Sequence, residues 1–177
     1  MKPVSLLLAA LFLISCEGDP GPMGPDGPRG PQGPPGFVGQ AFEVEAYFNE
    51  SNEYSEVFEI PQTIDIDDSD IVSVYWLWDV DEEAGDVWQP LPASVYFDDG
   101  GEMQYAFDHT QFDIQLFLYG NVDLGTVGDD YTQEQFFKVV ILPVEYVEAN
   151  KVDLSNMQEV MKAVDKSKVD RLRAVQQ

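Results

Sequence analysis

Carboxylates are the most abundant groups in this sequence that could carry chemistry, with 33 Asp and Glu residues against nine Lys and Arg. Carboxylate oxygens are the ligands that Ca²⁺ prefers. Two acidic clusters stand out, and they comprise Asp65, Asp67, Asp68 and Asp70 in the first and Asp79, Asp81, Glu82, Glu83 and Asp86 in the second. In the second cluster Gly85 comes one place too late for an EF-hand loop, and no helical pattern flanks it. Two interpretations follow: a weak calcium site with Asp79, Asp81, Glu83 and Asp86 as ligands, or solvated loops.

Catalytic groups are sparse. His109 is the only histidine, and nothing in the sequence marks a nucleophile that would complete a triad with it. A pair of carboxylates could serve a glycosidase, but 26 acids between residues 37 and 150 single out no pair. We therefore predict no catalytic residues and a function other than that of an enzyme.

The first 16 residues read MKPVSLLLAALFLISC. Lys2 supplies a positive start, Leu6 to Ile14 an apolar run too short to span a bilayer, and Ser15 a small residue at the cleavage point. The last four residues resemble the lipobox of bacterial lipoproteins, which implies that residues 1–15 are a signal peptide and that Cys16 carries covalent lipid. The alternative is an ordinary secretory signal with an accidental cysteine. Cys16 is the only cysteine, so one chain can form no internal disulfide.

Residues 16–40 contain a glycine at every third position, with proline directly after five consecutive glycines. The glycines are Gly18, Gly21, Gly24, Gly27, Gly30, Gly33, Gly36 and Gly39. A collagen-type triple helix needs this spacing because no larger side chain fits at the crowded axis. We therefore predict a homotrimeric stalk, which would span roughly 70 Å. The alternative is a single semi-rigid tether that does not trimerise.

Charge is distributed unevenly. Between residues 37 and 150 the only base is Lys138, whereas residues 151–177 hold six bases and four acids. So acidic a segment repels nucleic acid, and we predict no nucleic-acid partner. The basic residues Lys162, Lys166 and Lys168 are predicted to dock onto the acidic domain.

The acidic segment, residues 41–149, is predicted to fold as an antiparallel β-sandwich. Its charged residues alternate with large apolar ones at period two, which is typical of half-buried strands. The predicted strands are 42–48, 54–60, 71–78, 93–97, 102–107, 112–118 and 135–142. Asp98 to Gly101 reads as a turn between two of them, and Pro143 ends the last.

In residues 150–177 the spacing of the apolar residues changes from the period of a strand to that of a helix. Ser155 and Gln158 form a predicted capping box, and Met157, Val160, Met161 and Val164 make an apolar stripe at helical spacing. We predict an amphipathic helix, continued or restarted from Val169 to Val175, that packs on the sandwich or on a sister subunit.

The chain resembles the collagen-like lipoproteins of Gram-negative bacteria. The resemblance rests on the lipobox, the short Gly-Pro-X run and the acidic β-rich head. In the head the resemblance is carried by the aromatic stretches 74–77, 86–88, 96–97 and 105–108. It implies a lipid-anchored envelope protein with no assigned reaction. Glu17 and Asp19 resemble outer-membrane sorting signals and imply exposure at the cell surface.

Two functions follow from these features. One is a trimeric structural or interaction protein that presents its acidic domain at the cell surface. The other is an accessory or ligand-binding subunit of a larger outer-membrane protein assembly. Trp78 and Trp88, near the second acidic cluster, are either contact residues for a partner or part of the packing.

Overall fold

The computed structural model describes residues 38–83, 85–166 and 169–173. The predicted signal peptide, Cys16 and the repeat glycines from Gly18 to Gly36 lie outside these residues. Among the residues that are described, no helix is long and apolar enough to cross a membrane.

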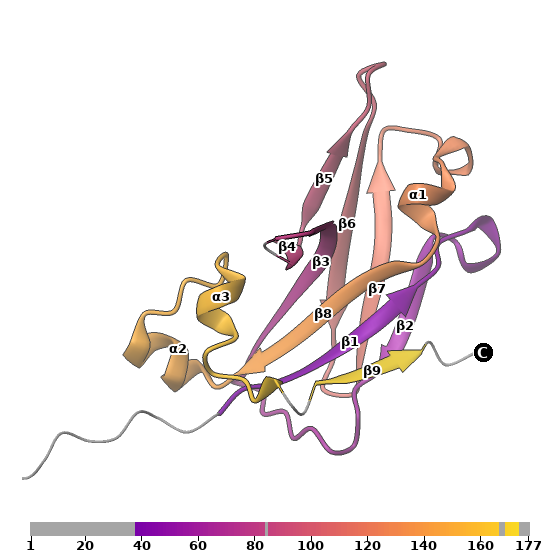
Figure 1. Ribbon diagram of the computed structural model, residues 1–177. Helices are drawn as coiled ribbons and strands as arrows, with labels where there is room; N and C mark the ends of the chain where they lie inside the picture. Colours follow the sequence, from indigo (N-terminus) through magenta and orange to yellow (C-terminus); the bar gives the residue numbers. More distant parts are fainter. Residues whose placement is uncertain (1–37, 84, 167–168, 174–177) are drawn as a thin grey trace, which may run out of the picture. The chain divides into compact units, whose positions relative to one another are not determined.

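Two β-sheets dominate the described residues (Figure 1). The first has the order β4-β3-β8-β1-β9 and consists of β4 (Gly85–Pro90), β3 (Ile71–Asp81), β8 (Gln135–Leu142), β1 (Gln40–Ala46) and β9 (Asp170–Arg173). The second has the order β2-β7-β6-β5 and consists of β2 (Ser55–Glu59), β7 (Asp113–Gly120), β6 (Glu102–His109) and β5 (Ala93–Tyr96). All pairs are antiparallel except β1 and β9. The prediction of a mainly β fold with seven strands at these places is confirmed.

The main core lies between the two sheets. Alternate residues of each strand point inward, so Phe42 and Val44 of β1 meet Ile114 and Leu116 of β7 in one cluster with Phe137 of β8. All five are fully buried. Burying large apolar side chains from two facing sheets is what stabilises a β-sandwich.

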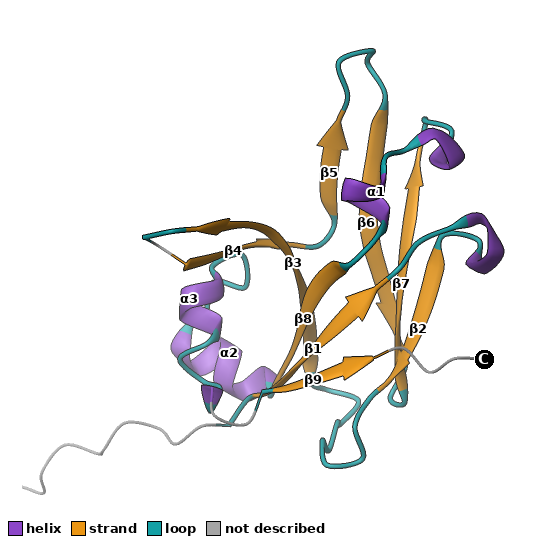
Figure 2. Cartoon of the chain, turned by 45° about the vertical axis from the view of Figure 1, so that its right-hand side comes forward, coloured by secondary structure: helices purple, strands orange, loops and turns teal. Residues whose placement is uncertain are grey.

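A second core covers the outer face of the five-stranded sheet. Helices α2 (Val144–Asn150) and α3 (Met157–Val160) lie on the side of that sheet away from the other one (Figure 2). Val160, Met161 and Val164 pack there against Tyr75, whose hydroxyl donates to the Leu154 carbonyl at 2.6 Å. The predicted apolar stripe therefore packs on the sandwich of its own chain.

The predicted helix itself is only partly present. Asn156, not Ser155, caps α3, because its side-chain oxygen accepts from the amides of Gln158 and Glu159 at 3.0 and 3.3 Å. Ser155 instead donates to Asp153 at 2.7 Å. The predicted helix from Val169 to Val175 is wrong for residues 170–173, which form β9.

Strand β9 forms because it completes the open edge of β1. Arg171 is in register with Glu43, and their side chains form an ion pair at 2.8 Å. Arg171 thus joins this segment to the acidic domain, although it is not one of the three lysines for which docking was predicted. Lys162 and Lys166 are exposed and form no ion pair with any described residue, while Lys168 lies outside the described part.

Gly39 ends the sequence repeat but belongs structurally to the sandwich. Its amide donates to the Ala163 carbonyl at 2.9 Å, and so does that of Val38 at 3.0 Å. A methyl group on Gly39 would overlap the buried side chain of Leu142. The start of β1 is thus held by the segment that follows α3.

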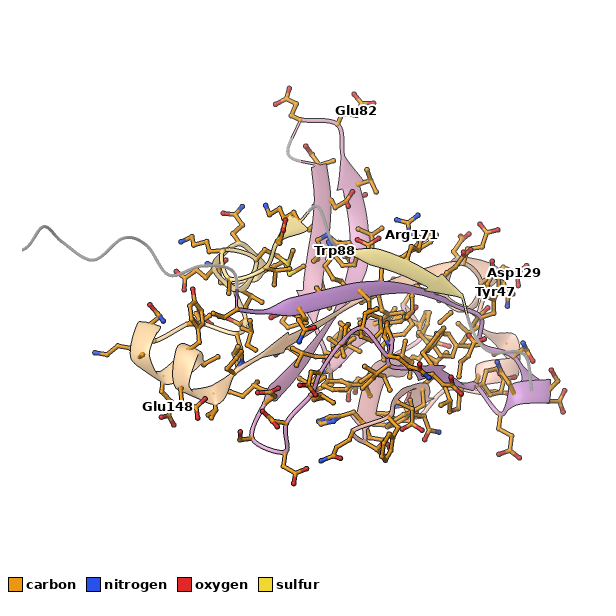
Figure 3. The ribbon with its side chains drawn as sticks, turned by 90° about the horizontal axis from the view of Figure 1, so that it is seen from below. Tyr47, Glu82, Trp88, Asp129, Glu148 and Arg171 are labelled. Atoms are coloured by element: carbon orange, nitrogen blue, oxygen red, sulfur yellow. The ribbon has the colours of Figure 1, made fainter. Side chains whose placement is uncertain are left out.

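Strands β3 and β4 extend as an arm beyond the rest of their sheet. Strand β8 pairs with β3 only as far as Trp76, so residues 77–81 pair with β4 alone, with an irregularity between Leu77 and Asp79. Figure 3 shows this arm with Glu82 at its tip. Strand β4 was not predicted, because the sequence from Gly85 to Pro90 mixes glycine, acid and proline with two large apolar residues.

Candidate functional site

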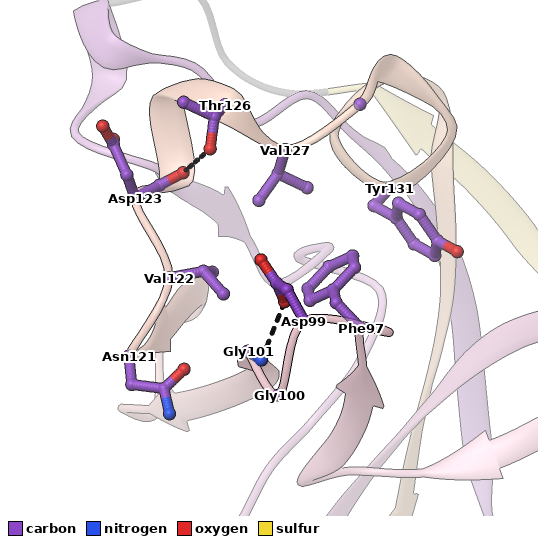
Figure 4. Close-up of a pocket in the computed structure, with 11 residues that line it drawn as sticks. Phe97, Asp99, Gly100, Gly101, Asn121, Val122, Asp123, Thr126, Val127 and Tyr131 are labelled. Carbon is purple, nitrogen blue, oxygen red and sulfur yellow. Dashed lines mark hydrogen bonds between the residues drawn. The ribbon is translucent and has the colours of Figure 1, made fainter.

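A pocket of about 770 Å³ lies at one end of the sandwich. It is formed by the β5–β6 turn, the segment that follows β7, and helix α1 (Asp129–Thr132), as Figure 4 shows. Its lining residues are Phe97, Asp99, Gly100, Gly101, Asn121, Val122, Asp123, Thr126, Val127, Gly128 and Tyr131. We call it the loop-end pocket. Loops positioned by a rigid sheet are a common place for binding sites.

The β5–β6 turn supplies one wall. The amide of Phe97 donates to the Gly101 carbonyl at 2.9 Å, and Gly100 has φ +87°, a value that favours glycine. The amide of Gly101 donates to the Asp99 carboxylate at 2.9 Å (Figure 4). This turn is the one predicted from Asp98 to Gly101, and it fixes the direction of the Asp99 side chain.

The segment after β7 supplies the second wall. Gly120 ends the strand where a Cβ would overlap the Glu102 carbonyl, so glycine is required by the close approach of β6. Asn121 then accepts from the Glu102 amide at 2.7 Å. Asp123 caps the short helix η2 (Leu124–Thr126) by accepting from the Gly125 amide at 3.0 Å.

Helix α1 closes the pocket. On its core side the helix is held by a buried network of polar side chains. The Tyr105 hydroxyl donates to the Tyr131 carbonyl at 2.7 Å and to Gln135 at 3.3 Å. Gln135 also accepts from the Trp76 indole at 2.9 Å and donates to the Asp130 carbonyl at 3.0 Å. Burial raises the pKa of Tyr105 far above its usual range, so its hydroxyl remains a donor.

The pocket combines aromatic walls with negative charge. The rings of Phe97 and Tyr131 meet edge to face at 5.6 Å between centroids. Asp99 and Asp123 are its only charged lining residues, and none of the eleven is basic. The Asp99 carboxylate lies near Phe97 and Val127 in Figure 4. Such a site is suited to binding a ligand that carries positive charge.

The predicted calcium ligands lie elsewhere, on the β3–β4 arm. Asp79, Asp81, Glu83 and Asp86 are all exposed there. In the described residues, no three Asp, Glu, His or Cys side chains come together as a metal site requires. The structure thus places the four residues on one hairpin without gathering them around a point.

The other predicted candidates lie away from the loop-end pocket. Asp65, Asp67 and Asp70 line an acidic cavity of about 280 Å³ near the start of β1. His109 is exposed at the end of β6 and stacks on Phe107, with ring centroids 6.4 Å apart. No predicted site residue lines the loop-end pocket.

Trp78 and Trp88, each expected to be either a contact residue for a partner or part of the packing, differ in environment. Trp78 is 48% exposed on the arm, and its ring meets that of Trp76 edge to face at 5.2 Å. Trp88 is half-buried against the second core, and the Lys138 ammonium lies 4.1 Å from its ring centroid. Trp78 therefore fits the contact interpretation and Trp88 the packing interpretation.

A comparison with protein-family models, one with curated proteins and one with solved structures each found no match to this chain.

Proposed function

We propose that the protein is a lipid-anchored, non-enzymatic binding protein of the cell envelope. In this proposal Cys16 carries the lipid, the glycine repeat forms a trimeric stalk, and the acidic β domain meets a partner at the outer surface. The pattern of Cys16 and the repeat in the sequence supports the anchor and the stalk.

The observation that carries the proposal is that the start of β1 and the loop-end pocket lie at opposite ends of the β domain. Strand β1 begins at Gln40, directly after the repeat, and runs to Ala46. The loop-end pocket lies near the far end of β1, where the Phe48 amide donates to the Thr132 carbonyl of α1 at 2.7 Å. A domain whose first strand starts at one end and whose loop-end pocket lies at the other is suited to presenting that pocket outward.

A second candidate, a subunit of a larger outer-membrane assembly, is favoured by the β3–β4 arm. The arm exposes Trp78, Val80 and Val87 beyond the sandwich, at 48%, 62% and 37%. Exposed apolar residues on a projecting hairpin are typical of protein contacts. A stoichiometric outer-membrane protein that co-purifies in detergent, and is lost in Trp78→Ser, would favour this candidate.

Two measurements on the full chain test the first candidate. Metabolic labelling with a fatty acid should mark the wild type and not Cys16→Ser. Deletion of residues 18–36 should lower the oligomeric mass in detergent from trimer to monomer. The deletion stops before Gly39 because that glycine packs in the β domain.

Each result has a contrary outcome. A chain that is not labelled lacks the anchor, and a trimer that survives the deletion is assembled by the β domain instead of the repeat. A wild type that is already monomeric would leave only a single-chain tether.

A further inference from the structure

We propose that the loop-end pocket binds an organic cation, the guanidinium or ammonium group of a basic side chain on a protein partner. This inference rests on the proposed function, for which it specifies the chemistry of the partner.

The size of the pocket fits such a group. At about 770 Å³ it lies within the range of roughly 300–1,000 Å³ that is usual for small-ligand sites. It is open to solvent on one side, so a side chain that projects from a larger molecule can enter it.

The charge of the lining selects a cation. Asp99 and Asp123 contribute two carboxylates, and no base lines the pocket to neutralise them. Two bases of the five-stranded sheet, Lys138 and Arg171, are both paired with Glu43 on the outer face of that sheet. An anionic ligand would be repelled, whereas a cationic one gains from the Asp99 carboxylate and from the acidity of the whole domain.

The aromatic walls favour an organic cation over a metal ion. A guanidinium or ammonium group is attracted to aromatic rings, which Phe97 and Tyr131 contribute to the lining, and its alkyl stem can pack on Val122 and Val127. A metal ion needs several oxygen ligands converging on one point. No such group of three exists in the described chain.

The site is also preorganised. The Gly101 amide fixes Asp99, the Gly125 amide fixes Asp123, and the Tyr105 hydroxyl holds the Tyr131 backbone. Walls that are already ordered lose little entropy on binding.

The test uses the full chain in detergent, labelled with ¹⁵N at glycine, and the probe is N-acetyl-arginine amide. Its matched control is N-acetyl-citrulline amide, which has the same shape without the charge. Gly100, Gly101 and Gly128 line the pocket and report on it. Gly85, beside Asp86 on the acidic arm, reports on unspecific attraction of cations.

We expect saturable shifts of the pocket glycines with the arginine probe, and none of comparable size with citrulline or at Gly85. Asp99→Asn keeps an oxygen for the Gly101 amide but removes the charge, and it should weaken binding by about tenfold. Asp98→Asn, in the same turn but outside the pocket lining, removes the same charge from the domain and should weaken binding much less than Asp99→Asn does.

Three outcomes would overturn the inference: equal shifts with citrulline, shifts at Gly85 that match those of the pocket, or unchanged binding in Asp99→Asn with its glycine spectrum intact. The titration does not depend on lipid or on the stalk, so its failure is distinguishable from the failure of the proposed function.

Discussion

Gln135 is one of two buried polar residues in the described core, and its side chain ties β3, β6 and α1 together. Gln135→Leu would leave the Trp76 indole N–H without its acceptor inside the core. A buried donor without a partner costs about 1–3 kcal/mol. We therefore expect the free energy of unfolding, measured with urea, to fall by that amount. Gln62→Leu, at an exposed position, is the control, and an equal loss there would contradict the explanation.

Glu43 and Glu56 are carboxyls whose pKa values move in opposite directions. Burial alone would raise the pKa of Glu43, but hydrogen bonds and charges from Arg171 and Lys138 outweigh it and lower the pKa below 4.5. Burial raises the pKa of Glu56 above 4.5, and the hydrogen bond from the Tyr47 amide opposes this only in part. Their contributions to stability must therefore depend on pH with opposite signs.

For Glu43, stability is present above its ordinary pKa and is lost as the pH falls through the lower folded value. Glu43→Gln should therefore destabilise the protein at pH 7, by an amount that shrinks in acid. For Glu56, the ionised form is disfavoured in the folded state. Glu56→Gln should therefore stabilise the protein at pH 7 and have little effect below pH 4.5. Urea unfolding across this pH range checks both, and the same sign for the two variants would refute the assignment.

At the scale of elements, the junction between β7 and β6 depends on one close approach. Gly120→Ala would place a methyl group against the Glu102 carbonyl and the Met103 backbone, neither of which can move without disturbing the sheet. We expect a loss of about 1–3 kcal/mol in the free energy of unfolding. Gly128→Ala, also in this loop region, would meet nothing within 4 Å and serves as the matched control. Equal losses in the two variants would show that the contact is not the cause.

Strands with a clear period of two could be predicted from the sequence, because alternation reflects burial on one face alone. Strands β4 and β9 could not. Strand β4 is stabilised by its hairpin partner and by α3, and β9 by the edge of β1, which lies more than 120 residues earlier in the chain. Helix α3 was overestimated because Val160, Met161 and Val164 have helical spacing, yet the chain leaves the helix after Val160 and still buries them.

The candidate site was harder to predict than the fold. The turn from Asp98 to Gly101 was recognisable from its two glycines, but the segment from Asn121 to Tyr131 has no regular period. A pocket made where loops from separate strands meet leaves no local pattern of its own. The abundant acids drew attention to the β3–β4 arm, whereas Asp99 became a candidate only once the structure placed it in one pocket with Phe97 and Tyr131.

At the scale of the whole molecule, charge is the dominant feature. Residues 37–150 carry 26 acids and one base, and such an excess destabilises the compact state through self-repulsion. Raising NaCl from low concentration to 0.5 M should therefore raise the melting temperature, by roughly 2–4 °C for each kcal/mol of repulsion screened. A melting temperature that does not respond to salt would contradict this.

Comparing the melting temperatures in CaCl₂ and in MgCl₂ tests for a specific calcium site. The described acids do not converge, so CaCl₂ and MgCl₂ at matched ionic strength should give equal melting temperatures. An additional increase with Ca²⁺, lost in Asp81→Asn, would instead support the calcium site predicted on the arm.

All three tryptophans of the chain, Trp76, Trp78 and Trp88, lie on the β3–β4 hairpin. Intrinsic fluorescence excited at the red edge of protein absorption therefore reports on this hairpin alone. A ligand at the exposed Trp78 acts on the emission directly, whereas one in the loop-end pocket acts through Trp76, whose indole donates to Gln135 beneath helix α1. An emission change that is seen in the wild type and lost in Trp78→Phe therefore locates the ligand on the arm.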